Sequence, residues 1–401
     1  MAKPKLRFPE FTDEWNKKQF NKILNENLDP IPTPKEEYIK LGIYCHAKGT
    51  FHKIVKKGEG LDVDTMYIVH KDNLIVNITF AWEHAIAITT EKDEGKIVSH
   101  RFPTYSFKEG QNPWFYHYLI SDKRMEYNLM IASPGGAGRN RVLNKKQFLK
   151  ISSYVPLMDE QQKIADFLSK VDEKIINQET VVSDYEEMKK GLMQKIFSQE
   201  VRFKADDGGK YPKWEEKTFG DVFEILEYGM NTAATDYDGF NKYIRITDID
   251  DTSHKYLTTD IVSPSGVLSD KYLVQENDIL FARTGASTGK SYLYRQEDGK
   301  LYFAGFLIRG HVKESYNSFF IFSQTLTEQY HRWVKIMSIR SGQPGINATE
   351  YAQFKFLCPC LEEQQKIANC LSAMDRKIEA EKKILEDWKE LKKALLQQMF
   401  V

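Results

Sequence analysis

The sequence predicts an α+β protein with two globular domains, each followed by one long helix, and it predicts that the two helices pair as an antiparallel coiled coil. Three observations carry this prediction: the chain contains two copies of one pattern, each copy ends in a heptad repeat, and mixed strand and turn signals precede each repeat. The 401 residues, 41% hydrophobic and 13% aromatic, are enough for two or three folding units with buried cores. This composition excludes a disordered chain.

The duplication is the strongest signal. The hexapeptide Glu-Gln-Gln-Lys-Ile-Ala occurs at 160–165 and again at 363–368, an offset of 203 residues. The match extends to both sides, pairing Asn144 with Asn347, Pro156 with Pro359, Leu168 with Leu371, Asp172 with Asp375 and Phe197 with Phe400. A weaker match pairs Arg7, Trp15 and Phe20 with Arg202, Trp214 and Phe219. We conclude that the chain consists of two half-length copies of one unit.

Each copy ends in a predicted long helix. Apolar residues recur there at alternating spacings of four and three, which is typical of a coiled-coil seam. In the first copy these positions are Ile164, Leu168, Val171, Ile175, Gln178, Val182, Tyr185, Lys189, Leu192 and Ile196; in the second they are Ile367, Leu371, Met374, Ile378, Glu381, Leu385, Trp388, Lys392, Leu395 and Met399. This spacing predicts helices over 156–198 and 359–401. Neither apolar stripe can be buried by its own helix, so each helix needs a partner.

Four polar residues interrupt the two seams: Gln178, Lys189, Glu381 and Lys392. An antiparallel pairing that aligns Lys189 with Glu381 also aligns Gln178 with Lys392 and leaves every other layer apolar. A parallel pairing would place Lys189 beside Lys392, which is a like-charge contact. We therefore expect the Lys189–Glu381 pair to help set register and direction.

The segments before the helices, 1–155 and 199–358, differ from them in kind. Short apolar runs at 74–80, 279–282 and 301–303 predict strands, and clusters rich in Gly, Pro and Ser predict turns between them. Each segment is therefore expected to form an α+β domain.

Charge is distributed unevenly over these domains. The chain has 57 basic and 57 acidic residues, so its net charge is +0 and any affinity for nucleic acid depends on local patches. Residues 96–150 contain ten basic and three acidic residues, and 281–345 contain nine and four, whereas 220–280 contain four and twelve. The two basic segments occupy equivalent places in the copies and include aromatic residues and Gly loops, a pattern that favours nucleic-acid binding.

Several motifs resemble catalytic or metal sites, but each lacks a feature that such a site needs. The loop from Gly285 to Ser291 resembles a phosphate-binding loop but has three residues between its glycines where that loop has four. Asn112-Pro-Trp-Phe115 resembles a methyltransferase tetrapeptide, but without the accompanying glycine-rich loop it predicts a turn entering a helix. The pair Cys358 and Cys360 has no counterpart in the first copy, and the histidines show no metal-ligand spacing. The sequence thus predicts a non-catalytic chain without cofactor or metal.

The location expected from the sequence is the cytoplasm. Mean hydropathy is -0.53, and no apolar run approaches the ~18 residues of a membrane helix. The first residues lack the apolar stretch of a secretory signal, and four unevenly spaced cysteines do not suggest a disulfide framework.

Two variable domains, each followed by Glu-Gln-Gln-Lys-Ile-Ala and a heptad helix, closely resemble the specificity subunit of type I restriction-modification systems. The resemblance covers the whole chain and includes the segments 276–285 and 341–347. The first copy departs from the Arg-Thr-Gly pattern of residues 283–285, which predicts that the two domains read different DNA sequences.

The resemblance implies a function and a set of partners. Residues 1–155 and 199–358 would be target recognition domains, each reading one half of a bipartite site in double-stranded DNA; 156–198 and 359–401 would be the central and C-terminal conserved regions. Two modification subunits would carry the S-adenosylmethionine chemistry on adenine, and restriction subunits would use ATP and Mg for translocation and cleavage. The alternative is a coiled-coil assembly scaffold whose globular domains bind protein; salt-dependent duplex binding distinguishes the two.

Candidate DNA contacts come from the basic segments and the loops beside them. They are Trp82, His84, Arg101, Lys123, Arg139 and Arg141 in the first domain, and Arg245, Arg283, Thr284, Lys290, Arg340 and Gln343 in the second.

Overall fold

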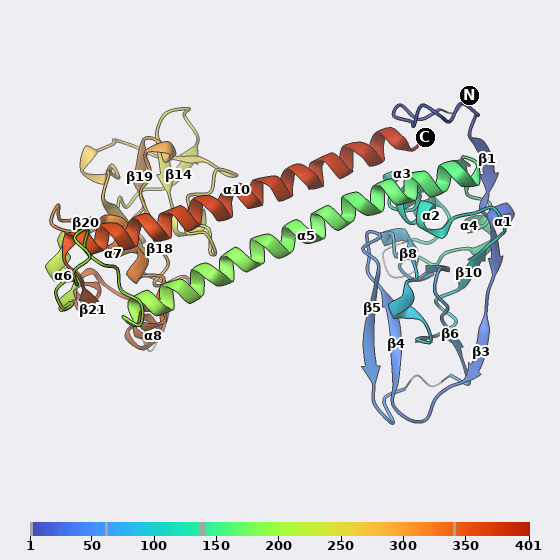
Figure 1. Ribbon diagram of the computed structural model, residues 1–401, viewed down its shortest axis with the longest axis horizontal. Coiled ribbons are helices and arrows are strands. Elements are labelled where there is room, and N and C mark those ends of the chain that lie inside the picture. Colours follow the sequence, from blue (N-terminus) through green and yellow to red (C-terminus); the bar gives the residue numbers. More distant parts are fainter. Residues whose placement is uncertain (1–2, 61–62, 137–140, 340–341) are drawn as a thin grey trace. The chain divides into compact units, whose positions relative to one another are not determined.

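The computed structural model describes residues 3–60, 63–136, 141–339 and 342–401 (Figure 1). The chain forms two compact units: unit 1 contains residues 1–180 and 383–401, and unit 2 contains residues 181–382. Two long helices, α5 (Met158–Phe197) and α10 (Leu361–Met399), contribute to both units. The predicted helices are therefore present, each starting two residues after its proline.

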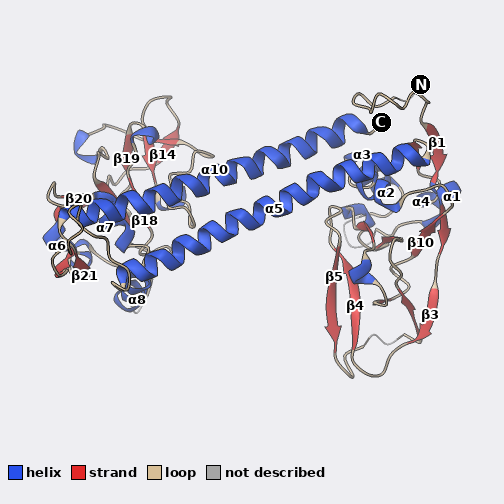
Figure 2. Ribbon diagram, in the orientation of Figure 1, coloured by secondary structure: helices blue, strands red, loops and turns tan. Residues whose placement is uncertain are grey.

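Unit 1 combines three small sheets with short helices (Figure 2). Its elements before α5 are β1 (Asn16–Gln19), α1 (Phe20–Ile23), β2 (Leu24–Glu26), β3 (Asp29–Pro32), β4 (Tyr38–Ile43), β5 (Thr50–Val55), β6 (Thr65–Ile68), β7 (Leu74–Val76), η1 (Ala81–Glu83), β8 (Ile86–Ile88), η2 (Glu91–Asp93), β9 (Ile97–Val98), β10 (Thr104–Phe107), α2 (Pro113–Leu119), α3 (Lys123–Ile131), α4 (Lys145–Phe148) and β11 (Ser152–Val155). The sheets have the orders β1-β11, β2-β10-β7-β8 and β3-β6-β9-β4-β5.

Unit 2 repeats much of this order. Its elements between α5 and α10 are β12 (Glu215–Thr218), α6 (Phe219–Val222), β13 (Phe223–Tyr228), β14 (Ala234–Asp236), β15 (Lys242–Ile244), η4 (Ile246–Asp248), β16 (Val262–Pro264), η5 (Asp270–Tyr272), β17 (Asp278–Ala282), β18 (Ser291–Leu293), η6 (Gln296–Asp298), β19 (Leu301–Phe303), β20 (Leu307–Val312), α7 (Ser318–Gln324), α8 (Glu328–Met337), α9 (Ala348–Tyr351) and β21 (Lys355–Cys358). The sheets are β12-β21, β13-β20-β17-β18, β14-β16 and β15-β19.

The four-stranded sheets β2-β10-β7-β8 and β13-β20-β17-β18 have the same strand order and the same antiparallel pairing. The units differ outside these sheets: unit 1 adds a five-stranded sheet, and unit 2 adds two two-stranded sheets. The duplication seen in the sequence is therefore a duplication of this scaffold, with different additions.

One predicted strand is shorter than its apolar run. The run at 74–80 forms a strand only over Leu74–Val76, because the Asn77 side chain then bonds to the chain two residues on. Its Oδ1 accepts from Thr79 N at 3.1 Å and from Thr79 Oγ1 at 2.7 Å. This local turn competes with strand pairing. The other two runs do lie in strands, β17 and β19.

The repeated Glu is a buried anchor in both units. Glu160 is 2% exposed and accepts from Arg7 Nε and Nη2, both at 2.7 Å, and from Trp15 Nε1 at 3.2 Å. Its counterpart in unit 2 accepts the same three bonds, from Arg202 at 3.1 and 2.5 Å and from Trp214 at 3.0 Å. The motif thus ties the segment before β1 or β12 to the start of the long helix, and it satisfies a buried charge with a bidentate partner.

The first repeated Gln joins the start of α5 to α2. Gln161 accepts from Asn112 N at 3.0 Å and donates to Pro156 O at 2.9 Å. Asn112 is the N-cap of α2, accepting from Trp114 N at 2.8 Å. In unit 2 the same bonds link Gln364 to Asn317 N and Pro359 O. The Asn-Pro-Trp-Phe segment is therefore a turn entering a helix, as predicted, and its Asn is occupied by capping.

The apolar seam of the long helices joins the core of each unit. In unit 1, Leu168 of α5 and Leu395 of α10 belong to one buried cluster; in unit 2, Ile196 of α5 and Ile367 of α10 belong to another. The heptad positions are thus buried against the partner helix and the adjoining domain together. This explains how stripes that cannot be buried by one helix are covered.

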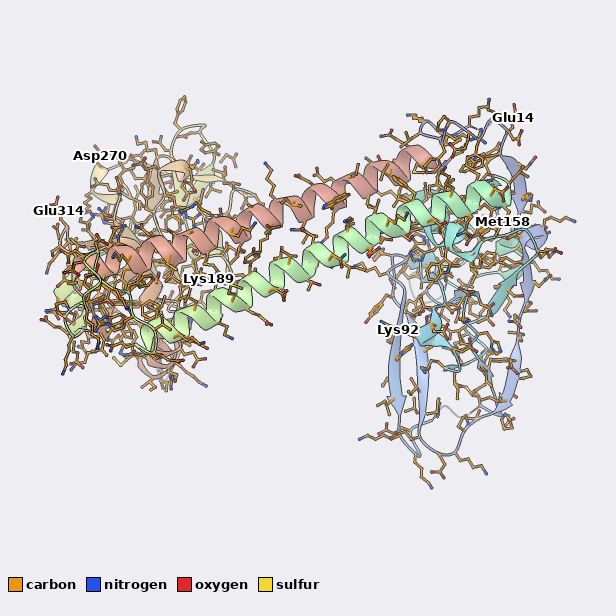
Figure 3. All side chains as sticks on the ribbon, in the orientation of Figure 1. Glu14, Lys92, Met158, Lys189, Asp270 and Glu314 are labelled. Atoms are coloured by element: carbon orange, nitrogen blue, oxygen red, sulfur yellow. The ribbon has the colours of Figure 1, made fainter. Side chains whose placement is uncertain are left out.

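Ion pairs link α5 to α10 in each unit. Unit 1 contains Asp172 with Lys392, and Glu179 with Lys389 at 2.8 Å. Unit 2 contains Glu186 with Lys382 at 2.6 Å, and Lys189 with Asp375 at 2.5 Å; Lys189 is labelled in Figure 3. The positions of each unit-2 pair correspond to those of a unit-1 pair at the offset of 203 residues, with the two helices exchanged. The Lys–Asp pair keeps its residue types, whereas in the Glu–Lys pair the two residue types are also exchanged.

These pairs correct the predicted register. Lys189 bonds to Asp375, which lies six residues, or about 9 Å, along α10 from the predicted partner Glu381. Lys392 likewise bonds to Asp172, six residues from the predicted Gln178. Glu381 pairs with Lys377 of its own helix at 2.5 Å. The prediction failed because the apolar positions of a heptad seam also align when one helix is shifted by seven residues. The ion pairs with acidic residues just outside the seam distinguish the two registers.

Candidate nucleic-acid interface

Two loops of unit 2 meet at the end of β17 and bring together three of the predicted DNA contacts. Arg283 O accepts from Ile346 N at 2.9 Å, Thr284 forms an isolated β-bridge with Gly345, and Gly285 N donates to Pro344 O at 2.9 Å. Gly285 has a φ of 76°, and a Cβ there would lie 3.1 Å from Gln343 Nε2. Arg283, Thr284 and Gln343 are therefore neighbours on one surface, at a turn that requires glycine.

The guanidinium of Arg283 is held in place by its neighbours. Its central carbon lies 4.9 Å from the ring centroid of Tyr228, and its Nε donates to Gly305 O at 3.1 Å. Tyr228 is 43% exposed, and the neighbouring Phe306 is 61% exposed. Within the described parts of the chain, no acidic side chain pairs with Arg283. A fixed, partly exposed guanidinium beside an aromatic ring is suited to contact with DNA bases or phosphates.

Unit 1 has the same backbone arrangement with different side chains. Ile78 N donates to Arg101 O at 3.0 Å, and Leu143 N donates to Ile78 O at 2.8 Å. The corresponding bonds in unit 2 run from Arg283 N to Phe306 O and from Ile346 N to Arg283 O. Ile78 therefore takes the place of Arg283, and Arg101 takes the place of Phe306. The two units present different chemistry at one position of a shared scaffold.

Other candidates of unit 1 are exposed or partly exposed. Arg141 lies over Trp82, with 5.7 Å from its guanidinium carbon to the ring centroid, and Trp82 Nε1 donates to Thr79 O at 3.2 Å. Arg101 is exposed on a turn, and Lys123 is exposed at the first residue of α3. These four residues remain candidates for DNA contact.

Three predicted contacts hold the fold instead. His84 is 4% exposed, and its Nε2 lies 2.6 Å from Ile120 O; burial lowers the pKa of His84. Arg245 forms ion pairs with Asp248 at 2.8 Å and with Asp260 at 3.2 Å. The Lys290 side chain is 11% exposed; it donates to Ile249 O at 2.9 Å and pairs with Asp251. These polar groups are already satisfied within the fold, so we withdraw all three residues as DNA contacts.

Arg139 and Arg340 lie outside the described residues, so they stay sequence predictions. Tyr228 and Phe306 were missed. A signal was available for Tyr228, because Gly229 follows it and a glycine beside a strand marks a close backbone approach; a Cβ at Gly229 would collide with Ala304 O.

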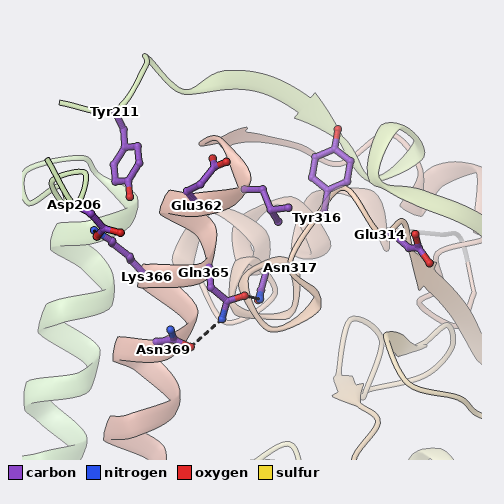
Figure 4. A pocket seen from close by; sticks show the side chains of 10 residues that line it. Asp206, Tyr211, Glu314, Tyr316, Asn317, Glu362, Gln365, Lys366 and Asn369 are labelled. Atoms are coloured by element: carbon purple, nitrogen blue, oxygen red, sulfur yellow. Dashed lines mark hydrogen bonds and ion pairs between the residues drawn. The ribbon is translucent and has the colours of Figure 1, made fainter. Parts of the chain in front are cut away.

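A surface pocket of about 720 Å³ in unit 2 is lined in part by Gln365 and Lys366 of the repeated motif (Figure 4). Gln365 accepts from Asn317 Nδ2 at 2.9 Å and donates to Asn369 Oδ1 at 2.9 Å, and Lys366 pairs with Asp206 at 2.5 Å. The lining is thus engaged in helix anchoring. Among the described residues, no three His, Cys, Asp or Glu side chains gather as metal ligands, and no helix is long and apolar enough to cross a membrane.

Comparisons with known proteins agree on one family. The family model for the type I restriction modification DNA specificity domain matches residues 16–182 and 211–389. The type I restriction enzyme MjaVIII specificity subunit of Methanocaldococcus jannaschii is 25% identical over 314 residues, covering 70% of this chain and 68% of that protein.

Solved structures share the fold at low sequence identity. A chain from a study of complex assembly and conformational transition of the type I R-M system has a TM-score of 0.60 at 14% identity and covers 98% of both chains. The S subunit from M. genitalium has a TM-score of 0.59 at 14% identity, covering 100% of this chain and 99% of that one. The HsdS subunit from Thermoanaerobacter tengcongensis has a TM-score of 0.50 at 15% identity, covering 98% of each chain. With two specificity domains matched in sequence, the chain belongs to the type I restriction-modification DNA specificity family, the non-catalytic subunits that recognise DNA sequence.

Proposed function

We propose that this chain reads a bipartite site in double-stranded DNA, with residues 1–155 reading one half and residues 199–358 reading the other. One observation carries the proposal: the equivalent positions Ile78 and Arg283 have the same backbone bonds but different side chains. A shared scaffold with different side chains at equivalent positions is suited to placing two readers in equivalent poses while each recognises different bases.

The long helices, over 156–198 and 359–401, would form an antiparallel coiled coil that spaces the readers. The ion pairs support this: residue numbers rise along α5 while they fall along α10, from Asp172–Lys392 to Glu179–Lys389 in unit 1 and from Glu186–Lys382 to Lys189–Asp375 in unit 2.

The chain would work in the cytoplasm within a complex. Two modification subunits would supply the S-adenosylmethionine chemistry, and restriction subunits would supply the chemistry that needs ATP and Mg. The duplication supports two copies of the modification subunit, because each half of the chain carries the same anchored motif at its helix start, Glu160 in one and Glu363 in the other.

Duplex binding over a salt series tests this function against the scaffold alternative. The complex of this chain with modification subunits is titrated with the duplex it methylates and with a scrambled duplex. A DNA reader binds both with log-linear salt dependence and binds the methylated site ~10³-fold or more tightly. Equal affinity for the two duplexes, or no binding, would contradict the proposal.

A further inference from the structure

The β4–β5 hairpin of unit 1 has a basic face. None of the residues predicted to contact DNA belongs to this hairpin. β5 is the edge strand of the five-stranded sheet, and it pairs with β4 so that Tyr38 lies opposite Val55 and Lys40 lies opposite Lys53. Side chains two residues apart on a strand share one face, so these four lie together. The sheets added to the scaffold of unit 2 have a different strand order, so this face belongs to unit 1.

Lys40 and Lys53 form a cross-strand pair of like charge. Such a pair, directly opposite, destabilises a sheet. Burial, Lys53 and Arg101 all lower the pKa of Lys40, so its charged form is disfavoured in the free chain. In the described ranges, no acidic side chain forms an ion pair with either lysine; Glu59 is the carboxylate nearby, lining the same pocket. A bound anion would relieve this repulsion.

Tyr38 adds a hydrogen-bond donor without a partner. The residue is 7% exposed, and its hydroxyl is buried with no hydrogen-bond partner among the described residues. A Cβ on Gly60 would lie 3.8 Å from this hydroxyl. Leaving a buried hydroxyl unpaired costs stability, so such groups usually have a protein, water or ligand partner.

These groups surround a small cavity. Tyr38, Lys40, Lys53, Ile54, Val55 and Glu59 line a pocket of about 190 Å³. This volume is below the ~300 Å³ at which small-molecule sites begin, and it suits a group the size of one phosphate. On the same face, the rings of Tyr44 and Phe51 lie 4.7 Å apart and are 50% and 38% exposed, which provides apolar surface beside the cavity.

We propose that Tyr38, Lys40 and Lys53 bind one backbone phosphate of DNA on the β4–β5 face, next to Arg101. The proposal rests on the DNA-reading function above and extends it: this face would position unit 1 on the duplex without reading sequence. A phosphate oxygen would accept from the Tyr38 hydroxyl, and its charge would offset the two ammonium groups.

The test measures duplex affinity of the complex with modification subunits over a salt series, with Lys40→Gln and Lys53→Gln combined. The slope of log affinity against log salt depends on the number of phosphates neutralised, and the two lysines share one phosphate, so we expect a decrease of about one. Affinity should fall equally for the methylated and the scrambled duplex, and the methylated sequence should stay the same. The Lys40→Arg, Lys53→Arg variant should keep the wild-type slope.

Two further variants sharpen the test. Tyr38→Phe removes only the hydroxyl; we expect about tenfold weaker binding, the loss for a hydrogen bond to a charged group, with no loss of thermal stability. Lys57→Gln is the matched control, because Lys57 is exposed, pairs with Glu36 and does not line the pocket. It should leave the slope within the error of the wild type.

Inorganic phosphate separates the two sources of this ligand chemistry. If inorganic phosphate raises the melting temperature of the wild type while the glutamine variant keeps the wild-type salt slope, the pocket binds free phosphate and the DNA proposal is wrong. An unchanged slope without any effect of inorganic phosphate also overturns it. Failure of the wild-type complex to bind DNA would refute the proposed function itself, which is a separate outcome.

Discussion

Lys189 of α5 donates to Asp375 of α10 at 2.5 Å, and Lys392 of α10 pairs with Asp172 of α5. The two pairs are equivalent in the repeat, because both the lysines and the aspartates are 203 residues apart in sequence. A lysine within the apolar seam thus meets an aspartate just outside it, once in each unit. The pair is partly buried, with side chains 18% and 30% exposed in unit 2.

A double-mutant cycle on Lys189 and Asp375 tests this register. Because the pair is partly exposed, we expect a coupling energy of about 1 kcal/mol in the free energy of unfolding. The matched cycle on Lys189 and Glu381 should give less than about 0.5 kcal/mol, because Glu381 lies six residues along α10 from Asp375, the partner of Lys189. A larger coupling to Glu381 than to Asp375 would restore the register predicted from the sequence.

The Glu160 anchor should contribute strongly to the stability of unit 1. Arg7→Ala leaves a carboxylate that is 2% exposed without its ionic partner, so we expect a loss of about 3 kcal/mol. Arg7→Lys keeps the charge but loses the bidentate geometry, so it should cost less. Native-state hydrogen exchange, read separately in each unit, measures the loss; an effect below about 1 kcal/mol would show that solvent replaces the arginine.

Stability of unit 1 should depend on pH through His70. Hydrogen bonds to Glu94 and Asp29 raise the pKa of His70 above 6.5 in the folded chain. The stabilisation is therefore fully present below about pH 6.5 and is lost as pH rises through the folded pKa. His70→Gln should flatten the pH dependence of unit 1 between pH 6 and 8; an unchanged profile would mean that the pH dependence arises elsewhere.

Arg283 and Lys290 should separate DNA contact from fold stability. Arg283→Ala removes a fixed guanidinium next to Tyr228, and we expect ~1–3 kcal/mol weaker binding to the methylated site with altered preference at one base position. Lys290→Ala removes a bond to Ile249 O, so it should lower thermal stability while the sequence preference stays the same. Competition binding against single-base variants of the site measures both; the reverse pattern would exchange the two roles.

The sequence predicted the repeat, both long helices and the scaffold class, because these depend on periodicities that a single chain shows. It did not predict which basic side chains are already bonded to other residues of the fold. Lys290 lies in the same glycine-containing, basic segment as Arg283, and His84 lies two residues after the aromatic Trp82. Their partners Ile249 and Ile120 are 41 and 36 residues away in sequence. The Lys40–Lys53 pair also depends on hairpin register, which apolar pattern alone did not indicate. Long-range partners decide these cases.

The central claim is that the two halves of the chain read two halves of one DNA site independently. It is tested most directly by exchanging residues 1–150 for the corresponding segment of a relative with a different site, followed by methylation-sensitive long-read sequencing of the host genome. The account predicts that one half of the methylated site changes and that the other half stays the same. A change in both halves together, or in neither, would contradict it.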